Sequence, residues 1–70
     1  MVMKVEGHDK RLHKIKDAAQ VLGYGRSFVF EEIRLGRLRT VGRGHTRRVP
    51  TEYLEEYIEL LKREAMTDAN

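Results

Sequence analysis

Cysteine is absent from this chain of 70 residues, so no disulfide can form. A small domain without cross-links must be stable through packing alone, which suits a reducing compartment such as the bacterial cytoplasm. The sequence also lacks the run of about 20 apolar residues that spans a bilayer, and residues 1–12 contain no apolar signal core. We therefore expect a cytoplasmic protein without a membrane partner, folded as one domain around one modest core.

Catalytic and metal-binding patterns are missing as well. His8, His13 and His45 are scattered along the chain, and neither an H-x-x-x-H pair nor a glycine-rich phosphate loop is present. Ser27 has no histidine in a sequence context that suggests a base. We expect no enzyme, no metal site and no cofactor.

Acidic side chains are absent from one particular segment. Residues 34–48 contain six arginines and no acid, whereas residues 52–64 contain five acids and two bases, although the formal net charge is only +3. Lys and Arg gain affinity for nucleic acid by displacing counterions condensed on the phosphates. Segregated basic charge therefore favours a phosphate-facing surface, and a solvated basic face is the alternative.

Two short helices joined by a tight turn are predicted in the first half of the chain. The first has apolar residues at i, i+3, i+4 and i+7, namely Ile15, Ala18, Ala19 and Leu22, and Gly23 stops it. The second covers roughly residues 26–35, with Val29 and Ile33 turned inward and Gly36 after it. Only residues 23–25 connect them, which is typical of a helix-turn-helix and also occurs in plain helical hairpins.

A β-hairpin is predicted over residues 38–49. Placing Val41 opposite Val49 brings both to the core and pairs Arg43 with Arg47 across a loop of Gly44, His45 and Thr46. The tip would then carry the basic residues Arg43, His45, Arg47 and Arg48.

A third helix is predicted after Pro50, with an apolar stripe of Tyr53, Leu54, Tyr57, Ile58 and Leu61. This stripe should cover Leu12, Ile15, Leu22, Ile33, Leu38, Val41 and Val49. The predicted fold is α+β and mostly helical: a winged helix-turn-helix over residues 12–64, with two short helices, a hairpin wing and a C-terminal helix. Residues 1–11 are expected to form a flexible arm and residues 65–70 a frayed tail.

The outer face of the second helix and the hairpin are the candidate DNA-binding surfaces. Arg, Ser and Glu can contact base edges or phosphates, and an aromatic ring can touch a thymine methyl group. The candidates on the helix are Arg26, Ser27, Phe30, Glu31 and Arg34, and those on the wing are Arg43, His45, Arg47 and Arg48. The alternatives are packing roles for Phe28 and Phe30, an ion pair between Glu31 and Arg34, and a solvated loop in place of the wing.

The order of these elements resembles the excisionase family of DNA-binding domains, related to MerR-type winged helices. The resemblance is carried by residues 15–23 (IKDAAQVLG), 26–30 (RSFVF), Ile33, 36–38 (GRL), the Gly44 wing, 48–50 (RVP), Leu54 and Tyr57. It implies a recognition helix in the major groove, a wing in the minor groove, and copies that bind side by side, bend DNA and promote excision with an integrase. Lys14 and Gly25 stand where such domains usually have Ser or Thr caps, and Phe28 and Phe30 where a small residue and Tyr are common.

Two other functions remain open from the sequence. A small bacterial or phage transcription regulator would make the same DNA contacts at a promoter. A protein-interaction adaptor would instead use the acidic third helix, with Tyr53 and Tyr57 as anchors.

Overall fold

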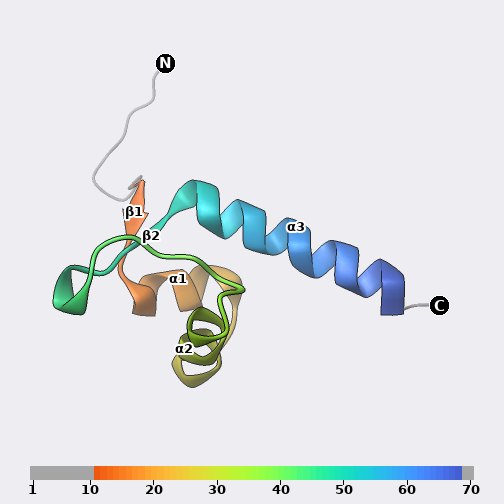
Figure 1. Cartoon of the computed structure of the whole chain (residues 1–70), viewed down its shortest axis with the longest axis horizontal. Coiled ribbons are helices and arrows are strands. Elements are labelled where there is room, and N and C mark those ends of the chain that lie inside the picture. Colours follow the sequence, from red (N-terminus) through yellow and green to blue (C-terminus); the bar gives the residue numbers. More distant parts are fainter. Residues whose placement is uncertain (1–10, 69–70) are drawn as a thin grey trace, which may run out of the picture.

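A computed structural model describes residues 11–68 of the chain. The elements follow in the order β1 (Leu12–His13), α1 (Ile15–Leu22), α2 (Arg26–Arg34), a 3-10 turn (Gly44–Thr46), β2 (Val49–Pro50) and α3 (Thr51–Asp68). Figure 1 shows α1 and α2 packed together beneath the small sheet. The mostly helical winged helix-turn-helix predicted from the sequence is confirmed. The expected flexible arm falls, except for Arg11, outside the described residues, as do the last two residues of the expected tail.

The turn between α1 and α2 forms as the sequence predicts. Gly23 adopts φ 78° and ψ 22°, and its amide donates to the carbonyls of Ala19 and Gln20. The Tyr24 amide also donates to Ala19, at 3.0 Å. Glycine suits this position because other residues pay a steric cost in the left-handed conformation. Neither α1 nor α2 has a side-chain hydrogen bond at its N-cap, in keeping with Lys14 and Gly25 at those positions.

The sheet joins the start of the described chain to the segment just before α3. β1 and β2 are antiparallel, with Leu12 opposite Pro50 and His13 opposite Val49. The Thr51 amide extends the pairing by donating to the Arg11 carbonyl at 2.8 Å. This pairing was not predicted from the sequence. The prediction that Leu12 lies in the core is wrong, since Leu12 is 50% exposed.

The wing is a loop closed by a single bridge, in a register different from the predicted one. Val41 pairs with Arg48, and not with Val49, through reciprocal amide bonds of 2.9 and 2.8 Å. Val49 instead pairs with β1 and is fully buried, whereas Val41 remains 37% exposed. The predicted burial of Val41 is therefore wrong, because the one-residue shift turns alternate side chains to opposite faces.

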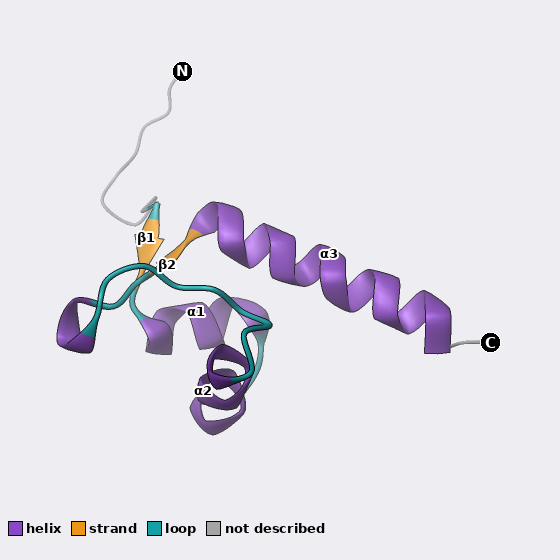
Figure 2. Cartoon of the chain, in the orientation of Figure 1, coloured by secondary structure: helices purple, strands orange, loops and turns teal. Residues whose placement is uncertain are grey.

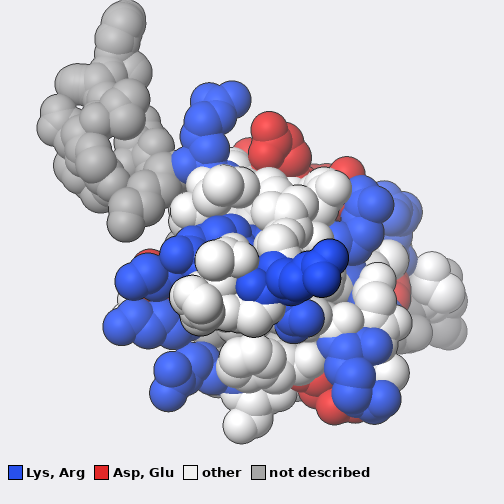
Figure 3. All heavy atoms as spheres, turned by 60° about the vertical axis from the view of Figure 1, so that its left-hand side comes forward, with Lys and Arg blue, Asp and Glu red and all other residues white. Residues whose placement is uncertain are grey.

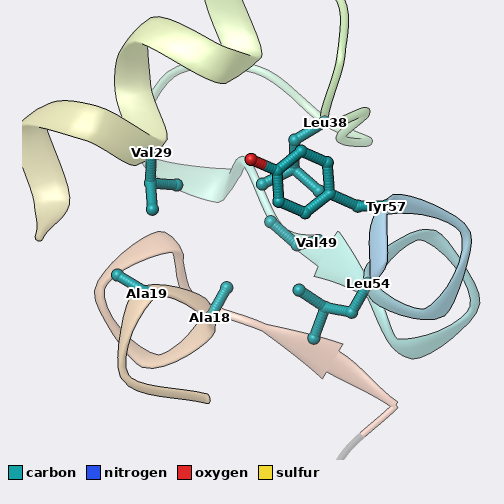
Figure 4. Packing of buried hydrophobic residues seen from close by; sticks show 7 residues of the cluster. All are labelled: Ala18, Ala19, Val29, Leu38, Val49, Leu54 and Tyr57. Atoms are coloured by element: carbon teal, nitrogen blue, oxygen red, sulfur yellow. The ribbon is translucent and has the colours of Figure 1, made fainter. Parts of the chain in front are cut away.

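The core lies where α1, α2, β2 and α3 meet. Figure 4 shows its buried side chains, which are Ala18, Ala19, Val29, Leu38, Val49, Leu54 and Tyr57. Ile15, Leu22 and Ile33 are partly buried against this cluster, as are Tyr53, Leu60 and Leu61. Most of the predicted core is thus confirmed. Leu12 and Val41 are exposed instead, and Ile58 is half-buried without belonging to the cluster.

Helix α3 is the longest element and continues past its predicted end. It begins at Thr51 directly after β2 and runs to Asp68, so it includes residues that the sequence assigned to a tail. Figure 2 shows its distal half extending away from α1 and α2. None of the helices within residues 11–68 is long and apolar enough to cross a membrane.

Candidate nucleic-acid interface

The outer face of α2 carries the predicted recognition residues. Val29 is 1% exposed and Ile33 is partly buried, so these two side chains fix which face turns inward. The five helix candidates, Arg26, Ser27, Phe30, Glu31 and Arg34, are all exposed. The structure therefore presents them together on the solvent side of one helix.

Glu31 and Arg34 form the ion pair that the sequence left open. Arg34 Nε lies 3.1 Å from Glu31 Oε1, and Arg34 Nη2 lies 2.5 Å from Oε2. The hydrogen bond from Arg34 holds the pKa of the Glu31 carboxyl below its usual range. Both side chains are at least half exposed, and pairs of this kind contribute little to stability. Arg34 can therefore exchange this carboxylate for a phosphate at little cost.

The two phenylalanines of α2 are surface residues rather than core residues. Phe28 is 47% exposed and packs edge to face against Tyr24, with ring centroids 4.6 Å apart. Phe30 is 49% exposed. A ring on this face has room to touch a base or a sugar.

The four predicted wing residues differ in exposure and in their contacts. Arg43 and His45 are exposed, and Arg47 is half-buried. Arg48 Nη1 donates to the carbonyls of His45 and Arg47, at 3.1 and 2.9 Å, so its guanidinium holds the loop in shape. Of the four predicted wing residues, Arg48 is therefore the one whose side chain stabilises the loop through hydrogen bonds to its backbone.

The conformation of the wing loop depends on Gly42, which the sequence places in the turn region of the hairpin. Gly42 has φ +81°, and a Cβ there would lie 2.7 Å from the Thr46 carbonyl oxygen. Thr46 in turn donates from its hydroxyl to the Arg43 carbonyl at 2.7 Å. These contacts fold the tip into a compact turn that presents Arg43 and His45 to solvent.

The arginines of residues 34–48 do not form one phosphate-facing surface. Arg37 bonds Glu64 of α3 at 2.6 Å, and Arg39 bonds Glu56 of α3 at 2.8 Å. Arg39 also lies over the ring of Tyr53, 4.4 Å from its centroid. The interpretation of the whole segment as a single basic surface is wrong for Arg37 and Arg39, because the acids of α3 fold back onto them.

A buried carboxylate, missed from the sequence, joins α2 to α3. Glu32 is 6% exposed; its Oε1 accepts from Tyr57 Oη at 2.6 Å and from Arg37 Nε at 2.8 Å. Burial raises the pKa of Glu32, but these hydrogen bonds outweigh it and leave the pKa below its usual value. In the sequence, the signal for the burial of Glu32 is its position beside Ile33, on the inner side of α2. Tyr57 is 2% exposed, so it cannot anchor a protein partner as the adaptor hypothesis requires.

Two hollows lined by basic residues flank α1, and the lysines in them were not among the DNA-binding candidates predicted from the sequence. One lies between the wing and the start of α1, lined by Lys14, Ile15, Gly44, His45, Arg47 and Arg48. The other lies between α1 and the start of α2, lined by Lys16, Asp17, Ala19, Gln20, Tyr24 and Arg26. Because α1 contributes to both, the wing and the start of α2 flank the same helix. Figure 3 brings the wing side of the molecule forward and shows separate groups of Lys and Arg around uncharged surface.

Comparison with known proteins identifies one family. A family model described as a helix-turn-helix domain matches residues 14–59, more than half of the chain. The match runs from the start of α1 into α3 and includes the wing. No curated protein and no solved structure matches the chain. Within residues 11–68, no group of three or more His, Asp or Glu side chains is placed to hold a metal ion.

Proposed function

The chain belongs to the helix-turn-helix domain family, which is DNA-binding, and we propose that it binds double-stranded DNA as an excisionase-like recombination directionality factor. The observation that carries the proposal is the placement of basic side chains on both sides of α1. The exposed Arg26 lies at the start of α2, and the exposed Arg43 and the half-buried Arg47 lie on the wing. One molecule can thus contact two neighbouring grooves.

Helix α2 acts as the recognition helix in the major groove. Arg26 and Ser27 lie in its first turn, where the helix dipole favours phosphate. Arg34 can form paired hydrogen bonds with guanine, and Glu31 can accept one from a cytosine amino group once their mutual pair opens. Phe30 adds an apolar contact on the same face.

The wing approaches the adjacent minor groove. Arg43 and His45 are exposed at the tip, and Arg47 lies at its base. Arginine in a minor groove responds to groove width and negative potential, so the wing would prefer narrow, A·T-rich segments. Arg48 keeps the loop in shape and is the least direct contact of the four.

The protein changes the shape of the DNA and catalyses no reaction itself. Copies bind side by side on attachment-site DNA, bend it and assist a phage or element integrase in excision. This part of the proposal rests on the resemblance of residues 12–58 to excisionases. A single small module buries roughly 600–1,000 Å² of its surface on DNA, so neighbouring copies would add needed affinity.

The proposal is tested by gel-shift titration on duplexes with one or two directly repeated sites, combined with circularly permuted probes that report bending. Cooperative binding to the repeats with a bend is expected. A single non-cooperative complex on straight DNA would contradict the recombination role and favour a transcription regulator with the same contacts. No duplex binding at all would contradict both.

A further inference from the structure

Basic side chains line the hollow between the wing and the first turn of α1, and none of its lining residues comes from the recognition helix α2. Its lining includes Lys14 from the start of α1, together with His45, Arg47 and Arg48 from the wing. These groups come from segments about thirty positions apart in the sequence. The fold therefore gathers several cationic side chains at one depression.

Within residues 11–68, no acid compensates the charge of this hollow. No acidic side chain lines it, and Lys14, Arg47 and Arg48 form no ion pair with any acid in the described part of the chain. By contrast, Arg34, Arg37 and Arg39 are each paired with a glutamate. Like charges repel, so an unneutralised cluster favours an anionic ligand.

One buried donor among the residues that line this hollow, the Nε of Arg47, makes no hydrogen bond within residues 11–68. Buried N–H groups in proteins nearly always have a hydrogen-bond partner, so this donor is unusual. Guanidinium and ammonium groups bind phosphate oxygens through charge-assisted hydrogen bonds.

We propose that this hollow binds one phosphate of the DNA backbone, with Lys14 as a phosphate-contacting residue. The proposal rests on the proposed function and deepens it. When α2 lies in the major groove and the wing in the adjacent minor groove, the sugar-phosphate backbone that separates these two grooves must pass α1. A phosphate held by Lys14 and Arg47 fixes the register between these two contacts, because phosphate contacts position a protein on its duplex.

Lys14→Ala tests the site with little risk to folding. Lys14 is exposed, its backbone is extended at φ −64° and ψ 154°, and its side chain makes no capping bond. Lys62→Ala is the matched control, because Lys62 lies on α3, lines neither basic hollow and is 67% exposed. Both variants remove one positive charge. Lys62→Ala also removes an exposed ion pair with Glu59, which contributes little to stability, so a lower salt slope in Lys14→Ala alone reflects the position of Lys14.

The first readout is the salt dependence of binding to a short mixed-sequence duplex. Lys14→Ala should reduce the slope of log K against log salt by about one, whereas Lys62→Ala should keep the wild-type slope. The second readout uses a duplex selected by the wild-type protein from a random library, with single phosphates replaced by methylphosphonate. One replacement should weaken wild-type binding strongly and weaken Lys14→Ala binding little further.

The outcomes separate the two proposals. If the wild type binds duplex DNA but the two variants have equal salt slopes, the phosphate site is overturned and the proposed function stands. The same conclusion follows if each methylphosphonate replacement weakens wild-type and Lys14→Ala binding equally. An equal reduction of the salt slope in both variants would show only non-specific electrostatic attraction, and it would also overturn the phosphate site. Failure of the wild-type protein to bind any duplex refutes the proposed function itself.

Discussion

Arg37 donates two hydrogen bonds to Glu64, from Nη1 to Oε2 at 2.6 Å and from Nη2 to Oε1 at 2.7 Å. Its Nε also donates to Glu32 of α2. A residue just after α2 is thereby tied both to α2 and to the distal half of α3. This contact uses the inner side of α2, so the outer face stays available for DNA.

The Tyr57 hydroxyl is predicted to stabilise the fold through Glu32. Tyr57→Phe removes a donor 2.6 Å from the buried carboxylate, and hydrogen bonds to charged groups contribute about 1.5–3 kcal/mol. The free energy of unfolding should fall by about that amount in urea denaturation. Tyr53→Phe is the control, because it keeps the ring on which Arg39 stacks. Equal effects of the two substitutions would contradict the role given to the buried bond.

The acid sensitivity of the protein should depend on Glu32 and Glu64. Burial opposes ionisation of Glu32, but its hydrogen bonds leave its folded-state pKa below the ordinary 4.5, and the bond from Arg37 does the same for Glu64. Folding therefore favours the ionised forms. Their stabilising contribution is present above the ordinary pKa and is lost as the pH falls through the lower folded values.

Urea unfolding measured from about pH 7 down to about pH 3 tests this pH dependence. The free energy of unfolding should decline more steeply for the wild type than for Glu32→Gln, which has no carboxylate to protonate at that position. Parallel pH profiles for the two proteins would show that Glu32 is not among the groups responsible.

Leu38 and Leu35 should differ sharply in their tolerance of truncation. Leu38 is 1% exposed and Leu35 is 53% exposed. Leu38→Ala should cost about 2–5 kcal/mol, because the removed atoms leave a cavity in the core. Leu35→Ala should change stability by less than about 1 kcal/mol. A thermal melt of each variant is sufficient, and similar losses would mean that the core is placed wrongly.

Gly42 is predicted to be required for the wing. In Gly42→Ala, the alanine must adopt the left-handed conformation of Gly42, which costs about 1–2 kcal/mol for residues other than glycine. Its Cβ would also clash with the Thr46 carbonyl. Both stability and duplex affinity should fall. Gly25→Ala is the stability control, since a Cβ there meets open space. A Gly42→Ala protein with wild-type melting temperature and affinity would show that the loop has another conformation.

The three helices could be predicted because each buries a stripe of apolar side chains at helical spacing. Ala18 and Ala19 in α1, Val29 in α2, and Leu54 and Tyr57 in α3 all reach the core as that spacing indicates. Local sequence also placed the turn, since Gly23 has the left-handed backbone that ends α1.

The sheet and the ion pairs could not be predicted because they depend on segments far apart in the chain. Two-residue strands show no alternation, so the pairing of His13 with Val49 left no pattern in the sequence. That pairing also sets the register of Val41 with Arg48. The partners of Arg37 and Arg39 follow from the path of α3 across the domain, which residue spacing does not specify.

The central claim is that the outer face of α2 and the wing contact duplex DNA together. A titration of the isotope-labelled protein with duplex DNA, followed by backbone NMR, tests it most directly. We expect the largest shifts at Arg26, Ser27 and Arg34 of α2, at Arg43 and His45 of the wing, and at Lys14 between them. Shifts concentrated on the distal half of α3, with α2 and the wing unchanged, would contradict it.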